Sequence, residues 1–498
     1  MNNKTLLFCL PAILGAPLFG AHASGKETPE DDGEKTGRPN VLFLLTDDQT
    51  FNTIRALGNT EIHTPNMDRL VRRGVAFTQT HVMGGLNGAV SQPSRAMLLT
   101  GRGLMDVHRN GGFIPQAEKT FPEVFRENGY TTFATGKWHS DNASFNRSFS
   151  TGANIFFGGM HPYGRNNELG HRRPYLHQYD PAGDYNDRNG AWADASPETF
   201  SSKLYADAAI GFLEAEASSG DPFLMYVAFT SPHDPRNVLP GYGRKYASAE
   251  LSMPANFVPQ HPFDNGDLNE RDEKLLPTPR VPEQVLAERA NYYGMVSEVD
   301  FQIGRILDAL EKSGKAANTI IVFTSDNGLC VGEHGLLGKQ NLYEAAVRIP
   351  MVICGPGIPQ NTVRDAYCYL YDLYPTLCGL AGIEVPATVK GVSLEETLRN
   401  PEAGKREDIL QRAIKKDGFK LILYNVDGQR HPQLFDLKAD PMEMKNLYDD
   451  PAYREKREEL TGLLYARMKA AGDFCDPAKP DWGYPGKLDW KQVVQVNP

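Results

Sequence analysis

The sequence predicts an α/β fold in which a mostly parallel sheet is sandwiched by helices. Five short and nearly continuous apolar runs are typical of strands buried on both faces, at residues 41–45, 131–135, 223–229, 320–324 and 351–354. Segments with helical start signals lie between these runs, as crossover connections require. A chain of 498 residues is expected to form one large domain and a smaller one.

The expected helices begin at polar residues that can cap a helix and are followed by proline or glutamate. Thr64-Pro65 and the capping-box pair Thr120 and Glu123 are two such starts, and Gly74 and Gly129 are the corresponding stops. We expect helices over residues 65–73, 120–128, 196–217 and 283–313.

The chain changes character near residue 386, so we expect a larger domain over residues 39–385 and a smaller α+β subdomain over 386–498. Residues 409–414, 420–423 and 433–436 resemble antiparallel strands, with Asp417-Gly418 as a hairpin turn between the first two. A helix over about 453–471 is expected to pack on this small sheet.

The N-terminus has the features of a secretory signal peptide over residues 1–23. Lys4 precedes an apolar run, and Ala21-His22-Ala23 offers a small-x-small cleavage site. Pro11 and Pro17 break the run, which argues against membrane insertion. We therefore expect cleavage near Ala23, a flexible tether over 24–38, and export to the periplasm or the medium.

Composition excludes some classes of partner and site. The 52 basic and 62 acidic residues give a net charge of −10, which does not suggest binding to nucleic acid. Six scattered cysteines, of which Cys9 lies in the signal peptide, argue against a disulfide framework and against a zinc site.

Polar side chains follow four of the predicted strands at the point where each ends: Asp47 and Asp48, Lys137 and His139, His233, and Asp326 and Asn327. Any one of these segments is typical of a turn. Because sites form at the carboxyl ends of strands in open α/β sheets, their joint occurrence indicates a functional site.

A further short motif reads Ser91-Gln92-Pro93-Ser94-Arg95, with Thr100-Gly101-Arg102 after it. Pro93 suits the first turn of a helix. The hydroxyl of Ser91 would then lie at the helix N-terminus, where backbone N–H groups favour negative charge. The alternative interpretation is a serine that simply caps a buried helix.

This motif resembles the signature of the type I sulfatases: Cys or Ser, any residue, Pro, Ser, Arg, with Thr-Gly-Arg nearby. The resemblance covers roughly residues 39–385 and recurs weakly in the C-terminal part. It implies an alkaline-phosphatase-like fold and oxidation of Ser91 to formylglycine (3-oxoalanine). Because position 91 is serine, it also implies a serine-type anaerobic sulfatase-maturating enzyme as a partner.

The resemblance implies one Ca²⁺ ion per chain and a set of catalytic side chains. The implied metal ligands are Asp47, Asp48, Ser91, Asp326 and Asn327. Such hard oxygen donors suit Ca²⁺ or Mg²⁺. The implied catalytic residues are Ser91, Arg95, Lys137, His139, His233 and Lys339.

Each implied catalytic residue has an expected role in hydrolysis of a sulfate ester. Lys137 and Lys339 would hold sulfate oxygens, and Arg95 would brace the formylglycine or its metal ligands. His233 is expected to protonate the leaving oxygen, with Lys339 as the alternative, and His139 to act as the base that releases sulfate.

Two long segments, about 140–196 and 231–282, are expected to be loops that recognise the substrate. The candidate substrate-binding residues are Arg165, His171, His177 and His334. We expect an exo-acting carbohydrate sulfatase, and a weak resemblance favours galactose or N-acetylgalactosamine derivatives.

Two other functions stay open. A phosphomonoester or phosphodiester hydrolase of the same fold would use two transition-metal ions with several histidine ligands. A secreted, non-catalytic glycan-binding homologue would result if Ser91 were never converted.

Overall fold

The structure is a computed structural model that describes residues 37–86, 90–161, 170–186, 188–194, 199–236, 238, 246–403 and 406–479. The expected signal peptide and almost all of the expected tether lie outside the described residues. Within them, no helix combines the length and the apolar character that crossing a membrane requires.

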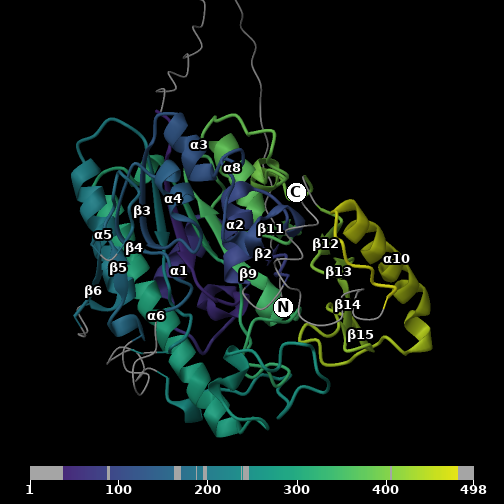
Figure 1. Ribbon diagram of the computed structural model, residues 1–498. Helices are drawn as coiled ribbons and strands as arrows, with labels where there is room; N and C mark the ends of the chain where they lie inside the picture. Colours follow the sequence, from purple (N-terminus) through teal and green to yellow (C-terminus); the bar gives the residue numbers. More distant parts are fainter. Residues whose placement is uncertain are drawn as a thin grey trace, which may run out of the picture. The chain divides into compact units, whose positions relative to one another are not determined.

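Five parallel strands form the centre of a larger mixed sheet (Figure 1). Their order is β8 (Thr319–Ser325), β1 (Asn40–Thr46), β7 (Phe223–Ala228), β3 (Thr131–Lys137) and β4 (Thr151–Phe156). The predicted strands account for four of these five. Because β1 and β8 pair from Asn40 opposite Thr319 to Thr46 opposite Ser325, both strands end at the same level.

The edges of this sheet contain antiparallel pairs. The fifth predicted strand, β9 (Arg348–Cys354), is antiparallel to β8 and to β2 (Val75–His81). Between β8 and β9 lies one short α-helix, α7 (Glu344–Val347), and no helix long enough to cross over the sheet. A parallel pair of strands needs such a crossover, so β9 pairs with β8 in the antiparallel direction. The remaining edge strands are β10 (Thr362–Arg364), β11 (Cys368–Tyr369), β5 (Tyr175–His177) and β6 (Gly190–Trp192).

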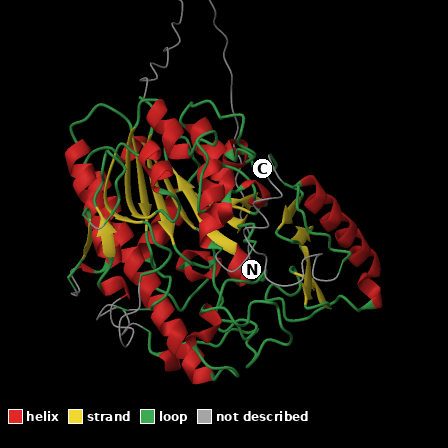
Figure 2. Ribbon diagram, viewed as in Figure 1, coloured by secondary structure: helices red, strands yellow, loops and turns green. Residues whose placement is uncertain are grey.

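Helices cover both faces of the sheet, as predicted (Figure 2). Phe43 and the other odd-numbered residues of β1 pack with α2 (Ser91–Thr100), α3 (Phe121–Glu127) and α8 (Leu373–Leu380). The even-numbered Leu42 and Leu44 pack with α1 (Pro65–Arg73), α5 (Ser201–Glu216) and α6 (Pro282–Lys312). This alternation gives two hydrophobic cores, one on each face.

Most predicted helix boundaries agree with the structure. The capping box is present at α3, where Thr120 and Glu123 exchange hydrogen bonds of 3.2 Å in both directions. The helix expected from residue 196 begins at Ser201, and residues 195–198 lie outside the described part. The segment 140–196 is not only loop, because it contains α4 (Asn142–Ser148) together with β4, β5 and β6.

The C-terminal part forms a separate antiparallel sheet with one long helix. The strands are β12 (Asp408–Leu410), β13 (Ala413–Lys416), β14 (Phe419–Val426) and β15 (Gln429–Asp436), which follow the short α9 (Glu395–Arg399). The expected strand over 409–414 is interrupted at Arg412, whose φ of 57° is incompatible with an extended strand. Asp417-Gly418 forms the hairpin turn as predicted, and α10 (Arg454–Ala470) packs on the sheet through Leu460 and Leu464.

The other face of the small sheet packs against the chain that follows β8. Ala413, Ile422 and Phe435 contact Leu336 and Tyr343 in a hydrophobic cluster. Beside this cluster, buried Glu344 accepts hydrogen bonds from Lys415 at 2.7 Å and Lys420 at 3.0 Å. Paired buried charges of this kind fix the small sheet next to the carboxyl ends of the central strands.

Candidate active site

Ser91 is the first residue of α2, and its side chain faces a group of acids. Its Oγ lies 3.1 Å from Asn327 Oδ1 and 3.4 Å from Asp47 Oδ1, and it accepts a hydrogen bond of 3.1 Å from Lys339 Nζ. The helix has no side-chain cap, so the interpretation of Ser91 as a simple capping serine is wrong. Gly101, with φ of 65°, ends the helix, and a Cβ there would lie 2.8 Å from Val389 Cγ1.

Two pairs of polar residues follow the carboxyl ends of the neighbouring strands β1 and β8. Asp47 and Asp48 follow β1, Asp326 and Asn327 follow β8, and all four are at most 1% exposed. The pairs also contact each other, because Asp48 N donates to Asp326 Oδ1 at 3.1 Å and Asn327 Nδ2 donates to Asp48 Oδ1. The matched ends of β1 and β8 thus concentrate three carboxylates in one buried place.

Three cations balance these carboxylates. Arg95 Nε donates to Asp326 Oδ2 at 2.8 Å, Lys137 Nζ donates to Asp47 Oδ2 at 2.6 Å, and Lys339 Nζ donates to Asp48 Oδ1 at 2.6 Å. Burial by itself raises the pKa of Asp47, but the charges of Lys137 and its neighbours outweigh burial and hold that pKa well below its usual range. Burial lowers the pKa of Lys339, yet the carboxylates around it, Asp48 first, leave that pKa above its ordinary value.

His233 presents one defined nitrogen to this group. Its Nδ1 lies 2.7 Å from the backbone oxygen of Asp234, and since a carbonyl oxygen only accepts, Nδ1 carries the proton. Its Nε2 lies 3.6 Å from Asp48 Oδ2. The Asp234 carboxylate is held in turn by Arg271, with Nη2 at 2.9 Å from Oδ1. His233 is therefore oriented with Nε2 toward Asp48.

His139 is a neutral imidazole at the other side of the site. It follows β3 with a positive φ of 66°, and its buried Nδ1 has no hydrogen-bond partner among the described residues. Burial, followed by the charges of Lys137 and Arg95, holds the pKa of His139 well below its ordinary value. A neutral imidazole can accept a proton, which is compatible with the expected role as a base.

The donors that surround Ser91 fit a hard divalent cation. Asp47, Asp48, Asp326, Asn327 and Ser91 offer oxygen atoms as ligands, and these side chains gather in one buried place, which is the donor set that Ca²⁺ or Mg²⁺ prefers. The ligand atoms of Asp47, Asp48 and His233 lie within 4.8 Å of one another. His233 was not among the predicted ligands, and its proximity to Asp48 is a feature that the sequence did not reveal.

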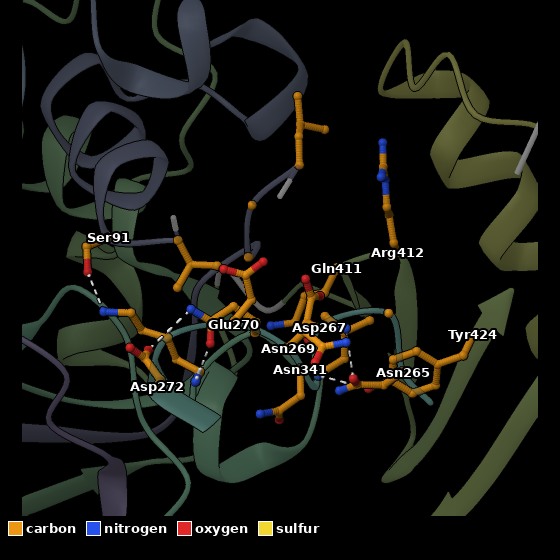
Figure 3. A pocket seen from close by; sticks show the side chains of 18 of the residues that line it. Ser91, Asn265, Asp267, Asn269, Glu270, Asp272, Asn341, Gln411, Arg412 and Tyr424 are labelled. Carbon is orange, nitrogen blue, oxygen red and sulfur yellow. Dashed lines mark hydrogen bonds between the residues drawn. The ribbon is translucent and has the colours of Figure 1, made fainter. Parts of the chain in front are cut away.

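A cavity of about 940 Å³ opens next to Ser91. One end is lined by Ser91, Lys137, His139, His233 and Lys339. The other walls include residues 264–267 and 269–272, residues 340–342, and Gln411, Arg412 and residues 423–427 of the C-terminal part (Figure 3). The wall over 264–272 lies within the segment 231–282 that the sequence predicted to recognise the substrate, whereas the walls formed by residues 340–342 and by the small sheet were not predicted.

Three of the four predicted substrate-binding residues, His171, His177 and His334, do not line this cavity. His171 is 1% exposed; its Nε2 lies 2.8 Å from the backbone oxygen of His233, and its Nδ1 lies 2.9 Å from Ser201 Oγ. His177 on β5 bonds Asn189, and His334 stacks on Tyr343 with ring centres 3.7 Å apart. Both ring nitrogens of His171 bond to other groups of the protein, and one of these bonds holds the backbone of His233 in place. Arg165 lies outside the described residues.

The fold and the site together define a sulfuric ester hydrolase. The chain belongs to the sulfatase family, whose model matches residues 39–383, and the model described as N-sulphoglucosamine sulphohydrolase, C-terminal, matches residues 332–470. The type I sulfatase resemblance seen in the sequence is thereby confirmed.

Individual relatives agree with this assignment over most of their length. An N-acetylglucosamine-6-O-sulfatase of Bacteroides thetaiotaomicron is 29% identical, over 93% of this chain and 92% of the relative. A sulfatase of Formosa agariphila is also 29% identical, over 93% and 92% of the two chains.

Solved structures share the fold. A protein in complex with its substrate D-glucosamine-2-N,6-O-disulfate superposes with a TM-score of 0.71 and 25% identity, over 89% of this chain and 99% of that chain. A phosphonate monoester hydrolase of Agrobacterium radiobacter has a TM-score of 0.69 and 23% identity over 87% and 96%, a likeness that concerns the fold alone.

Proposed function

We propose that the protein is an exo-acting carbohydrate sulfatase that hydrolyses a sulfate ester on a glycan-derived sugar through a formylglycine made from Ser91. The observation that carries the proposal is the position of Ser91, among Asp47, Asn327 and Lys339 at the wall of a cavity of about 940 Å³. A cavity of this size accommodates a sugar. The formylglycine in turn requires the serine-type maturating enzyme, and the N-terminal signal favours action outside the cytoplasm.

The side chains of this site divide into sulfate-binding and proton-transferring groups. Asp47, Asp48, Asp326, Asn327 and residue 91 would hold a calcium ion, which would supply positive charge next to the sulfate, and residue 91, once converted to formylglycine and hydrated, would supply the nucleophilic oxygen. Lys137 and Lys339 place ammonium groups where sulfate oxygens would bind. Arg95 keeps Asp326 oriented through its 2.8 Å hydrogen bond. His233, when its Nε2 is protonated in addition to Nδ1, would donate the Nε2 proton to the leaving sugar oxygen, and neutral His139 would accept a proton when sulfate is released.

The configuration of the sugar is the least supported part of the proposal. The expected preference for galactose or N-acetylgalactosamine assigned sugar contacts to His171 or His177, neither of which lines the cavity. Both a curated relative and a solved complex carry glucosamine in their names. We therefore name a 6-O-sulfated glucosamine derivative as the first candidate substrate, with the galactose series as the alternative.

A matched substrate panel tests this proposal. The panel comprises N-acetylglucosamine, galactose and N-acetylgalactosamine as 6-sulfates, and N-acetylglucosamine 6-phosphate. We expect release of sulfate, fastest from the glucosamine derivative, and at least about 100-fold lower kcat/KM for the phosphate ester. Faster release of phosphate would support the phosphatase alternative. Binding without turnover by protein from native host material, in which residue 91 is found as unmodified serine, would support the non-catalytic one.

Substitution of His233 tests its role as the proton donor. His233→Ala is expected to lower kcat by about 10²- to 10⁴-fold on a sugar sulfate and by less than about tenfold on an activated aryl sulfate, because only the poor leaving group needs a proton. The measurement is kcat for both substrates in both proteins. Equal losses on the two substrates would remove His233 from this role and assign it to Lys339.

A further inference from the structure

Arg271 joins two buried carboxylates at the cavity. Its Nη2 donates to Asp234 Oδ1 at 2.9 Å, and its Nη atoms also contact Asp234 Oδ2 and Asp272 Oδ1. Asp234 and Asp272 are 5% and 3% exposed, whereas 41% of the Arg271 side chain is exposed. Because a planar guanidinium donates along fixed directions, such pairs orient a carboxylate as well as neutralise it. Arg271 therefore holds both acids in defined orientations.

The first of these acids, Asp234, borders the candidate proton donor. His233 Nδ1 lies 2.7 Å from the backbone oxygen of Asp234 and 3.2 Å from its carboxylate Oδ1. The same Oδ1 accepts the 2.9 Å hydrogen bond from Arg271. Arg271 thus draws on the carboxylate, and the Nδ1 proton of His233 bonds the closer backbone oxygen. This is the ring orientation that directs Nε2 toward Asp48.

The second acid, Asp272, anchors Arg271 to the segment that contains Lys339. Asp272 Oδ2 accepts a hydrogen bond of 3.2 Å from Gln340 Nε2. Gln340 Oε1 accepts one of 3.1 Å from the backbone N–H of Lys339. A continuous series of contacts therefore runs from His233 through Arg271 to the chain at Lys339. It connects the two side chains that are candidates for the proton donor, which follow β7 and β8 respectively.

We propose that Arg271 is a positioning residue for His233, and that it fixes the place of the His233 ring relative to the Lys339 segment. The inference rests on the proposed function, in which His233 protonates the leaving oxygen. Without Arg271, the Asp234 carboxylate would compete with the backbone oxygen for the Nδ1 proton, because it lies only 3.2 Å from Nδ1. The ring would then turn, and a displacement of about 1 Å at a reacting group can cost about 10²-fold in rate.

A series of aryl sulfates with leaving groups of graded pKa tests this role. A poor leaving group needs a proton and a good one does not, so loss of the donor makes log kcat/KM fall more steeply with leaving-group pKa. We expect a steeper slope than in the wild type for Arg271→Ala as well as for His233→Ala. Arg271→Ala should lower kcat by about 10- to 100-fold on a sugar sulfate and by less than about threefold on the most activated aryl sulfate. An equal loss on all substrates, or no loss, would overturn the proposal.

Arg271→Lys is the second variant, because it keeps a positive charge between the two buried carboxylates and so protects the fold. Its ammonium group lacks the planar fork, and the slope should still be steeper than in the wild type. A wild-type slope in every folded variant of Arg271 would contradict the proposal. The matched control is Arg69→Ala on α1, since Arg69 likewise joins two carboxylates, Asp308 and Glu311, but does not line the cavity. This control should leave the slope unchanged.

A double-mutant cycle shows whether Arg271 acts through His233. In a His233→Ala protein, the further change Arg271→Ala should lower kcat on the sugar sulfate by less than about twofold, because two residues that act through one group are not additive. A further loss as large as that in the wild-type background would show that Arg271 acts by another route, and would overturn the proposal.

The slopes also separate this inference from the proposed function. A steeper slope in His233→Ala with a wild-type slope in the Arg271 variants would keep His233 as the donor and reject Arg271 as its positioning residue. A wild-type slope in His233→Ala would reject the donor of the proposed function, and the role of Arg271 with it. If the wild type hydrolyses aryl sulfates but no sugar sulfate, the carbohydrate function fails, and the aryl series still decides the role of Arg271.

Discussion

Ser91→Ala is expected to lower kcat/KM for any sulfate ester by at least about four orders of magnitude, because it removes the precursor of the nucleophile. The fold should be kept, since Ser91 does not cap α2 and its hydroxyl interacts only with groups of the site. The measurement is steady-state hydrolysis beside a thermal unfolding curve.

The matched variant for this experiment is Ser91→Cys. Because the family signature accepts either residue, Ser91→Cys should be active when it is produced in a host whose maturating enzyme converts cysteine. Ser91→Ala should be inactive in every host. Retention of more than about one hundredth of the activity by Ser91→Ala would remove residue 91 from the chemistry.

Asp326→Ala is expected to abolish turnover and to destabilise the protein by about 3–5 kcal/mol, because the buried Arg95 loses the carboxylate that accepts its Nε hydrogen bond and keeps only the longer contact of 3.8 Å with Asp47. Arg95 is 0% exposed, and its Nε donates to Asp326 Oδ2 at 2.8 Å. The same change removes a charged ligand of the proposed calcium ion. In the wild type, calcium at about 100 times its Kd should add about 2.7 kcal/mol of stability, and this increment should be lost in the variant.

Chemical unfolding with and without calcium measures both effects. Asp308→Ala is the control, because Asp308 pairs with Arg69 at the surface with 62% of its side chain exposed, and its loss should cost less than about 1 kcal/mol. An Asp326→Ala protein that unfolds like the wild type and is still stabilised by calcium would show that Asp326 is not a ligand.

The central sheet and the gathering of the candidate catalytic residues could be predicted because both follow local rules. Continuous apolar runs indicate strands buried on both faces, and polar residues that end parallel strands gather at one edge. The acids after β1 and β8 meet because Thr46 pairs opposite Ser325. Ser91, Lys137, His139, His233 and Lys339 line one cavity, as the family motifs implied.

The segment 231–282 was predicted to recognise the substrate and contributes one wall of the cavity, but the individual residues of the walls could not be predicted, because they depend on packing between distant segments. His171 lies in a sequence rich in hydrogen-bond donors, but it turns inward, stacks on Phe200 and supports the backbone of His233. Tyr424 and Asn425 reach the cavity only because the small sheet packs on the chain around Tyr343. In a long connecting segment, the type of a residue alone does not predict which way its side chain points.

The mass of the peptide that contains residue 91 tests the central claim most directly. The peptide should come from enzyme of measured specific activity, produced together with a serine-type maturating enzyme. We predict a peptide that lacks two hydrogens relative to serine, in a fraction that rises in proportion to activity on the sulfated sugar. Full activity from protein in which residue 91 is wholly unmodified serine would contradict the proposed function at its chemical core.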